Sequence, residues 1–63
     1  MNISLKINRF SKGLKAREVA KRINISEVYM NQIEAGRIPS LEIQNRIARV
    51  LGVSRETLFN GKS

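Results

Sequence analysis

The sequence predicts an all-α fold in which five short helices surround one small core. Apolar residues recur along the chain at the three- and four-residue spacing of amphipathic helices. Glycine or asparagine follows each of the first four apolar segments, where helices commonly end. No segment of useful length alternates apolar and polar residues as a half-buried strand does. A length of 63 residues suits one domain, so we expect residues 1–63 to form a single domain.

The first helix is expected over residues 3–12. Ile3, Ile7 and Phe10 stand at positions i, i+4 and i+7, which predicts that they form its broad apolar face. Gly13 follows at the position after the helix end, where glycine is favoured. This assignment makes the three apolar residues candidates for the core.

The second helix is expected over Ala16–Ile23, and its start is only half-specified. Leu14 and Val19 have the spacing of a hydrophobic staple, and Glu18 stands at the third helical position, where it can accept from the N-cap backbone. Lys15 occupies the N-cap itself and is a poor cap, because its side chain has no acceptor oxygen.

A tight turn is expected to join the second helix to a third one. Asn24 is the expected turn residue, since such a turn needs a positive φ and Asn is the usual substitute for Gly. Ser26 is a good N-cap, and Ile25 and Met30 have the spacing of a second staple. Gly36 ends the third helix.

Two further helices are expected in the C-terminal part of the chain. Ser40 caps a fourth helix over residues 41–51, and Ser54 caps a short fifth helix that ends near Phe59. Residues 60–63 are expected to be a frayed tail. The predicted apolar set of the fourth helix is Leu41, Ile43, Ile47, Val50 and Leu51.

The charge balance indicates a polyanionic partner. Twelve Lys and Arg stand against five acidic residues, which gives a net charge of +7. Residues 1–25 carry seven Lys and Arg against one Glu, a net charge of +6. Such an asymmetry most often serves nucleic-acid binding. The alternative is a basic surface that only keeps the protein in solution.

The composition argues against catalysis and against a bound cofactor. The chain has no histidine, which removes the usual general base and the commonest metal ligand, and no cysteine for a disulfide or a zinc thiolate. We therefore predict a protein that is not an enzyme and needs no cofactor and no metal. No apolar run approaches the ~20 residues of a membrane span, and a signal core is absent, so the expected location is the cytoplasm.

Five motifs follow one another in the chain: G-L-x-x-x-x-V-A (13–20), I-x-I-S (23–26), I-E-x-G (33–36), P-S-L-E (39–42) and I-A-x-x-L-G-V-S (47–54). In order and spacing they resemble the helix-turn-helix domain of the phage repressor and Cro type, the XRE family, over nearly the whole chain. The resemblance implies a lambda-repressor-like fold with the helix-turn-helix at the second and third helices. It also implies a homodimer on a near-palindromic operator of double-stranded DNA, with the third helix in the major groove and the second across the backbone.

The sequence departs from the family pattern in three places. The family prefers Ser or Thr and then a phosphate-binding Gln at the start of the second helix, where this chain has Lys15 and Ala16. Lys15 or Arg17 would replace that contact with a charged one. Asn24 stands at the usual turn glycine, and Asn8 occupies a position of the first helix that is usually apolar.

The exposed face of the third helix is predicted to read base edges. With Met30 and Ile33 pointing inward, Val28 points outward and suits a thymine methyl. The amides of Asn31 and Gln32 suit adenine, and a Glu carboxylate suits the cytosine amino group. The candidates for base contacts are Glu27, Val28, Asn31, Gln32 and, at the helix start, Ser26.

The resemblance places the remaining functional residues around this helix. An Arg of the first helix pairs with a Glu of the third in the family, which implies a structural ion pair of Arg9 with Glu34. The surface near the fifth helix would form the dimer interface, with Val53, Leu58 and Phe59 as candidates, of which at least one is expected to be core instead. Arg46, Arg49 and Arg55 are expected to be solvated and distant from DNA. The phosphate-contact candidates are Lys15, Arg17, Lys21, Arg22, Arg37 and Tyr29, the last with its ring packed and its hydroxyl near the backbone.

The sequence favours a cytoplasmic transcriptional regulator, specifically a repressor that occupies its operator. One alternative is the antitoxin of a toxin–antitoxin pair, which has the same fold and a protein partner. A protein-binding helical module, with the basic charge serving only solvation, belongs to a different class. A basic amphipathic helix on a membrane surface is disfavoured, because the capped turns indicate a compact fold.

Overall fold

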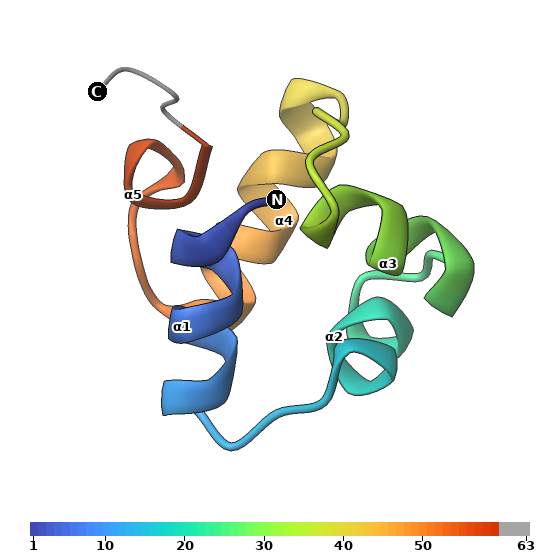
Figure 1. Cartoon of the computed structure of the whole chain (residues 1–63), viewed down its shortest axis with the longest axis horizontal. Helices are drawn as coiled ribbons and strands as arrows, with labels where there is room; N and C mark the ends of the chain where they lie inside the picture. The colour runs from blue at the N-terminus through green and yellow to red at the C-terminus, as the bar shows by residue number, and fades with distance from the viewer. Residues whose placement is uncertain (60–63) are drawn as a thin grey trace.

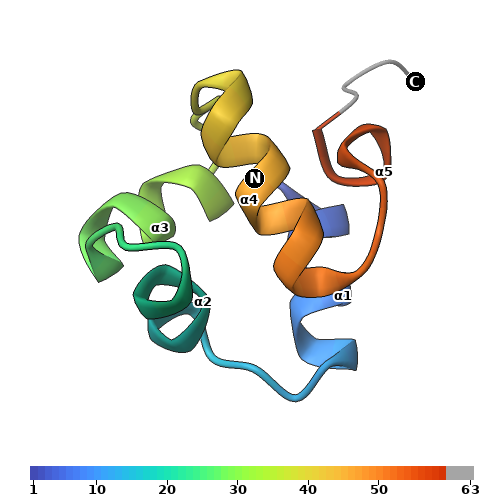
Figure 2. The ribbon, with the colours of Figure 1, turned by 180° about the vertical axis from the view of Figure 1, so that it is seen from behind.

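Five α-helices make up most of residues 1–59, the part of the chain that the computed structural model describes. Figure 1 shows α2 and α3 together on one side of the molecule and α5 on the other, and Figure 2 shows the same arrangement from behind. These residues contain no strand, so the prediction of an all-α fold with five helices is confirmed. The predicted tail, residues 60–63, lies outside the described residues. The helices are α1 (Ile3–Ser11), α2 (Ala16–Arg22), α3 (Glu27–Glu34), α4 (Leu41–Leu51) and α5 (Arg55–Phe59).

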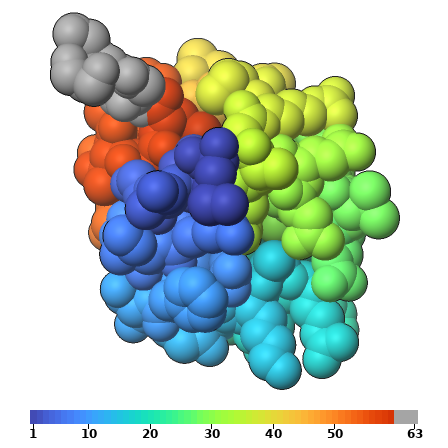
Figure 3. All heavy atoms as spheres, viewed as in Figure 1, coloured from blue at the N-terminus to red at the C-terminus, as the bar shows by residue number. Residues whose placement is uncertain are grey.

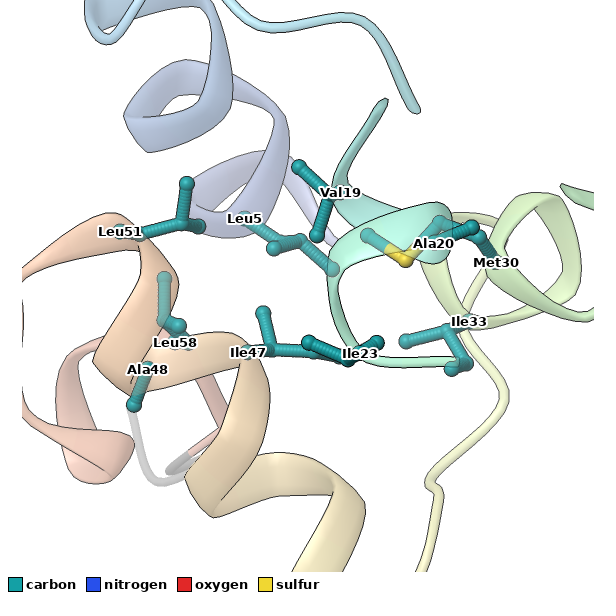
Figure 4. Close-up of a cluster of buried hydrophobic side chains, with 10 residues drawn as sticks. All are labelled: Leu5, Val19, Ala20, Ile23, Met30, Ile33, Ile47, Ala48, Leu51 and Leu58. Atoms are coloured by element: carbon teal, nitrogen blue, oxygen red, sulfur yellow. The ribbon is translucent and has the colours of Figure 1, made fainter. Parts of the chain in front are cut away.

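One apolar core joins all five helices. Figure 3 shows one face of the molecule, on which the side chains of neighbouring segments pack against one another. Figure 4 shows the ten buried apolar side chains, with Leu5 of α1 near the middle, Met30 and Ile33 of α3 on one side, and Ala48, Leu51 and Leu58 on the other. Since each helix is too short to be stable alone in water, this shared burial holds the five helices in place. The ten residues are Leu5, Val19, Ala20, Ile23, Met30, Ile33, Ile47, Ala48, Leu51 and Leu58.

The apolar face predicted for α1 is wrong. Ile3, Ile7 and Phe10 are 59%, 57% and 69% exposed, respectively. The side of α1 that faces the core carries Leu5, which is fully buried, and Arg9, which is 8% exposed. The three exposed residues therefore form an apolar stripe on the outside of the domain, which we call the α1 stripe.

Polar contacts to other helices explain this orientation of α1. The Asn2 carboxamide caps α1 by accepting from Leu5 N–H at 3.0 Å, and it donates through Nδ2 to the carbonyl of Leu58 in α5 at 2.9 Å. The backbone N–H of Asn2 donates to the carbonyl of Glu34 in α3 at 2.8 Å. About two turns further along the chain, Arg9 of α1 binds the Glu34 carboxylate. These bonds turn the side with fewer apolar residues toward the core.

The helix starts follow the predicted capping pattern. The hydroxyls of Ser26, Ser40 and Ser54 each accept the backbone N–H three residues further on, at 3.0 to 3.3 Å. In α4 the predicted apolar set is correct except for Leu41, which is exposed. Leu41 precedes Ile47 by six residues, and at about 100° per residue this turns it about 120° away from the buried face.

Candidate nucleic-acid interface

The turn between α2 and α3 has the predicted left-handed residue. Asn24 has φ 62°, and its N–H donates to the carbonyl of Lys21 at 3.3 Å. The N–H of Ile25 donates to the carbonyl of Ala20 at 3.0 Å, which completes a Schellman motif. This motif satisfies the carbonyls at the end of α2 and sets the direction in which α3 leaves.

Arg46 of α4 supports the same turn, contrary to the expectation that it is only solvated. Its Nη1 donates to the carbonyl of Ile23 at 3.2 Å, and its Nη2 binds Glu42 at 2.6 Å. Arg46 also lines, with Arg22 and Arg49, a shallow pocket of about 290 Å³ between the end of α2 and α4. The structure thus brings Arg22, a candidate for phosphate contact, together with two arginines of α4.

The start of α2 is half-capped, as the sequence predicts. The Glu18 carboxylate accepts from the backbone N–H of Lys15 at 2.7 Å, which is one half of a capping box. The other half needs an acceptor on the N-cap side chain, and a lysine ammonium has none. The Lys15 side chain is exposed at the N-terminal end of α2, where the helix dipole also favours an anion.

Helix α3 has the inward and outward faces that the sequence predicts. Met30, Ile33 and Glu34 are buried. The Ser26 hydroxyl at its start is occupied by the backbone N–H of Tyr29 at 3.0 Å. Figure 3 shows α3 at the edge of the molecule with its outer face uncovered. The exposed residues on it are Glu27, Val28, Asn31 and Gln32.

Arg9 and Glu34 form a buried, two-pronged ion pair between α1 and α3. Arg9 Nε donates to one carboxylate oxygen of Glu34 at 2.5 Å, and Nη2 donates to the other at 3.1 Å. Nη1 donates to the carbonyl of Leu14 at 2.9 Å, so the guanidinium also fixes the loop before α2. With exposures of 8% and 4%, both residues lie inside the fold and hold α3 against α1.

Arg37 folds back onto α3, a contact that sequence reasoning missed. Its Nη1 donates to Oε1 of Gln32 at 2.7 Å, and its guanidinium carbon lies 4.9 Å from the centre of the Tyr29 ring. Tyr29 is half-buried and packs against the core. Two phosphate-contact candidates and one base-contact candidate are thus joined in one cluster, which we call the Tyr29–Arg37–Gln32 cluster.

The remaining phosphate-contact candidates are surface cations of α2. Arg17, Lys21 and Arg22 are all exposed, and so is Lys15 before them. Helix α2 packs against α3, and Figure 1 shows the two helices together on one side of the molecule. This side combines positive charge with a row of hydrogen-bonding side chains, which is the combination that DNA recognition uses.

One of the three dimer candidates is core. Leu58 is buried among the ten core residues and has no surface to offer a second chain, which corrects its assignment. Val53 and Phe59 are half-buried and keep part of their surface. Phe59 lines a shallow pocket of about 300 Å³ together with residues 1–4, residues of α5, and Gly36 and Ile38 of the segment between α3 and α4.

Comparison with known proteins supplies one match. A family model described as a helix-turn-helix domain matches residues 4–58, which include α2, the Asn24 turn and α3 in full. No curated protein and no solved structure matches the chain significantly. Within residues 1–59, no helix has the length and apolar character needed to cross a membrane.

Proposed function

Because this chain belongs to the helix-turn-helix domain family, we propose that it is a sequence-specific regulator of transcription of the phage repressor and Cro type, the XRE family. In this proposal, α3 lies in the major groove of double-stranded DNA and α2 crosses the backbone. The observation that carries the proposal is the uncovered polar face of α3, on a chain with a net charge of +7. The chain acts in the cytoplasm, as a single domain and without a cofactor.

The base contacts come from the outer face of α3. Val28 packs against a thymine methyl, and Gln32 and Asn31 hydrogen-bond to purine edges. Glu27 accepts from the amino group of cytosine. Ser26 contributes least, because its hydroxyl already accepts from the backbone of α3. Each well-placed bidentate contact discriminates against the wrong base by about 1–3 kcal/mol.

The phosphate contacts come from the cations around α3. A cation that neutralises a phosphate releases a counterion, so the affinity falls steeply as salt rises, with a slope of about −0.9 per contact on a double-logarithmic plot. Tyr29 contributes its hydroxyl while its ring stays packed. The proposed cations are Lys15, Arg17, Lys21, Arg22 and Arg37.

The proposed regulator binds a near-palindromic operator as a homodimer and represses by occupying the promoter. Two-fold symmetry of the protein then matches two half-sites about one helical turn, 34–36 Å, apart. Val53 and Phe59 are the proposed dimer contacts. They offer little apolar surface, so the dimer is weak without DNA and is stabilised by binding two half-sites together.

Selection of binding sites from a random duplex library tests this function. The proposal predicts an enriched sequence with two-fold symmetry and a half-site spacing near 10 base pairs. The matched control is Gln32→Ala, which should relax the preference at one position of each half-site and leave the spacing unchanged. A library that shows no enrichment after repeated selection would rule out sequence-specific binding.

The α1 stripe favours a second candidate function, an antitoxin that also binds a protein. Ile3, Ile7 and Phe10 expose apolar surface on the same side of one helix, and contiguous exposed apolar surface is a mark of protein-interaction sites. A protein that co-purifies with the chain and abolishes its DNA binding would support this candidate. Unchanged DNA binding in the presence of co-purifying proteins would favour the regulator alone.

A further inference from the structure

Arg37 is held against α3 by three contacts, and two of them involve Gln32. Its backbone N–H donates to the Gln32 carbonyl at 3.0 Å, within a Schellman motif that ends α3. Gly36, with φ +127°, lets the chain turn back at this point. The Arg37 Nη1 donates to Gln32 Oε1 at 2.7 Å, and the Tyr29 ring lies 4.9 Å from the guanidinium carbon.

We propose that Arg37 is a positioning residue for Gln32 and makes this side chain read guanine. The inference rests on the proposed function, since it names the base that one residue of α3 selects. It also changes the role of Arg37. A residue that contacted only phosphate would strengthen binding to every sequence equally.

The bound Arg37 decides which end of the Gln32 amide meets the DNA. A glutamine carboxamide has one acceptor end and one donor end, and unrestrained it suits adenine, which presents a donor and an acceptor in the major groove. Here the acceptor Oε1 already receives a hydrogen bond from a cation. Nε2 keeps both of its N–H donors without a partner among residues 1–59.

The cluster therefore presents hydrogen-bond donors of two side chains, Gln32 and Arg37, to the DNA. Guanine presents two acceptors, O6 and N7, at its major-groove edge. The adenine amino group would instead bring a second donor to the oxygen that already accepts from the Arg37 cation, and the positive charge there disfavours this approach. Thymine offers a single acceptor, O4, beside its methyl group. Guanine thus satisfies more of the donors than either alternative.

The Tyr29 ring keeps this arrangement in place in water. An exposed arginine normally samples many rotamers, and its hydrogen bond to a neighbouring amide competes with water. Stacking on an aromatic face restricts the guanidinium, because the cation is attracted to the negative face of the ring. The ring itself is fixed by packing against the core. The packed Tyr29 ring thus restricts the Arg37 guanidinium, and the guanidinium in turn restricts the orientation of the Gln32 amide.

The test compares base preference at the position that Gln32 reads, identified as the one at which Gln32→Ala loses its preference. Each variant is titrated against four duplexes that differ only at that base pair. We expect the wild-type chain to prefer guanine over adenine by about tenfold, within the range for one base contact. Arg37→Ala should reduce this ratio at least fivefold, because the freed Gln32 amide can again bind adenine.

Arg17→Ala is the matched control, since it removes an exposed arginine of α2 with the same charge. It should weaken all four duplexes equally and leave the ratio unchanged. Tyr29→Phe keeps the ring and should keep the ratio, whereas Tyr29→Leu should lower it. Circular dichroism of each variant verifies that the helices are intact.

Two results would overturn the inference while leaving the proposed function standing. One is a wild-type preference for a base other than guanine at the Gln32 position. The other is an Arg37→Ala variant that weakens all four duplexes equally, as the control does. A wild-type chain that binds every duplex alike would contradict the proposed function itself, and the inference would fall with it.

Discussion

Removing the carboxylate of Glu34 should unfold much of the protein. The substitution Glu34→Ala leaves the Arg9 guanidinium buried, with its Leu14 carbonyl contact but without its anion. Loss of one partner of a buried pair costs about 3–5 kcal/mol. At about 0.05–0.15 kcal/mol per residue, the whole chain is stable by about 3–9 kcal/mol. The substitution therefore removes a large share of the stability.

Urea unfolding followed by circular dichroism measures this loss. With a slope near 1 kcal/mol per molar urea for so small a domain, the midpoint should fall by about 3 M or more, or the variant should be unfolded without urea. Glu42→Ala is the control, because Glu42 forms an exposed ion pair with Arg46 at 2.6 Å. That exposed pair should contribute about 0.5 kcal/mol or less.

A double variant separates the buried charge from simple loss of packing. Arg9→Met with Glu34→Leu removes both charges and keeps apolar volume, so it should be markedly more stable than Glu34→Ala alone. A Glu34→Ala variant that loses no more stability than Glu42→Ala would show that the buried charge is not costly. A double variant that loses as much stability as the two single changes added together would show the same.

Substitutions at four further positions test separate parts of the fold by the same unfolding assay. Asn24→Val should cost about 1–2 kcal/mol because a β-branched residue resists φ 62°, whereas Asn24→Gly should preserve stability; equal stability of the two would contradict this. Lys15→Ser should add about 0.5–1 kcal/mol by completing the capping box with Glu18, and a loss of stability would count against it. Leu5→Ala should cost about 2–5 kcal/mol of stability and Ile7→Ala under about 0.5 kcal/mol. A larger loss for Ile7→Ala than for Leu5→Ala would mean that the apolar face predicted from sequence is the buried one.

The order of helices and the caps were predictable because they depend on neighbouring residues. A serine N-cap, an apolar staple or a residue with positive φ acts over three to five positions, so its signal lies in the local sequence. Ser26 and Asn24 perform the roles assigned to them. The inward and outward faces of α3 follow from the same local pattern.

The orientation of α1 was not predictable from apolar spacing. Its inner side carries a single apolar residue, Leu5, and is fixed by the hydrogen bonds of Asn2 and by the pair of Arg9 with Glu34. These bonds join positions that are distant in sequence, and the spacing of apolar residues carries no information about such polar contacts. The ion pair implied by the family resemblance predicts the orientation of α1 better. Ile7 precedes Arg9 by two residues, so when Arg9 points toward Glu34, Ile7 points about 200° around the helix from it.

The Tyr29–Arg37–Gln32 cluster was also beyond the sequence pattern. Spacing alone placed Gln32 on α3 and Arg37 in the loop, where it was assigned to phosphate. The contact depends on the backbone direction after Gly36 and on the packed position of the Tyr29 ring. Neither is encoded in a motif of a few residues, because both arise when the loop folds back on α3.

Titration of the chain with its selected duplex and with a base-scrambled duplex, at several salt concentrations, tests the central claim most directly. If α3 reads DNA sequence, the affinity for both duplexes should fall with salt, and the selected duplex should bind about 10³-fold more tightly or better at physiological salt. Gln32→Ala should narrow that ratio while keeping the salt slope. Equal affinity for the two duplexes at every salt concentration would contradict the claim that α3 reads DNA sequence.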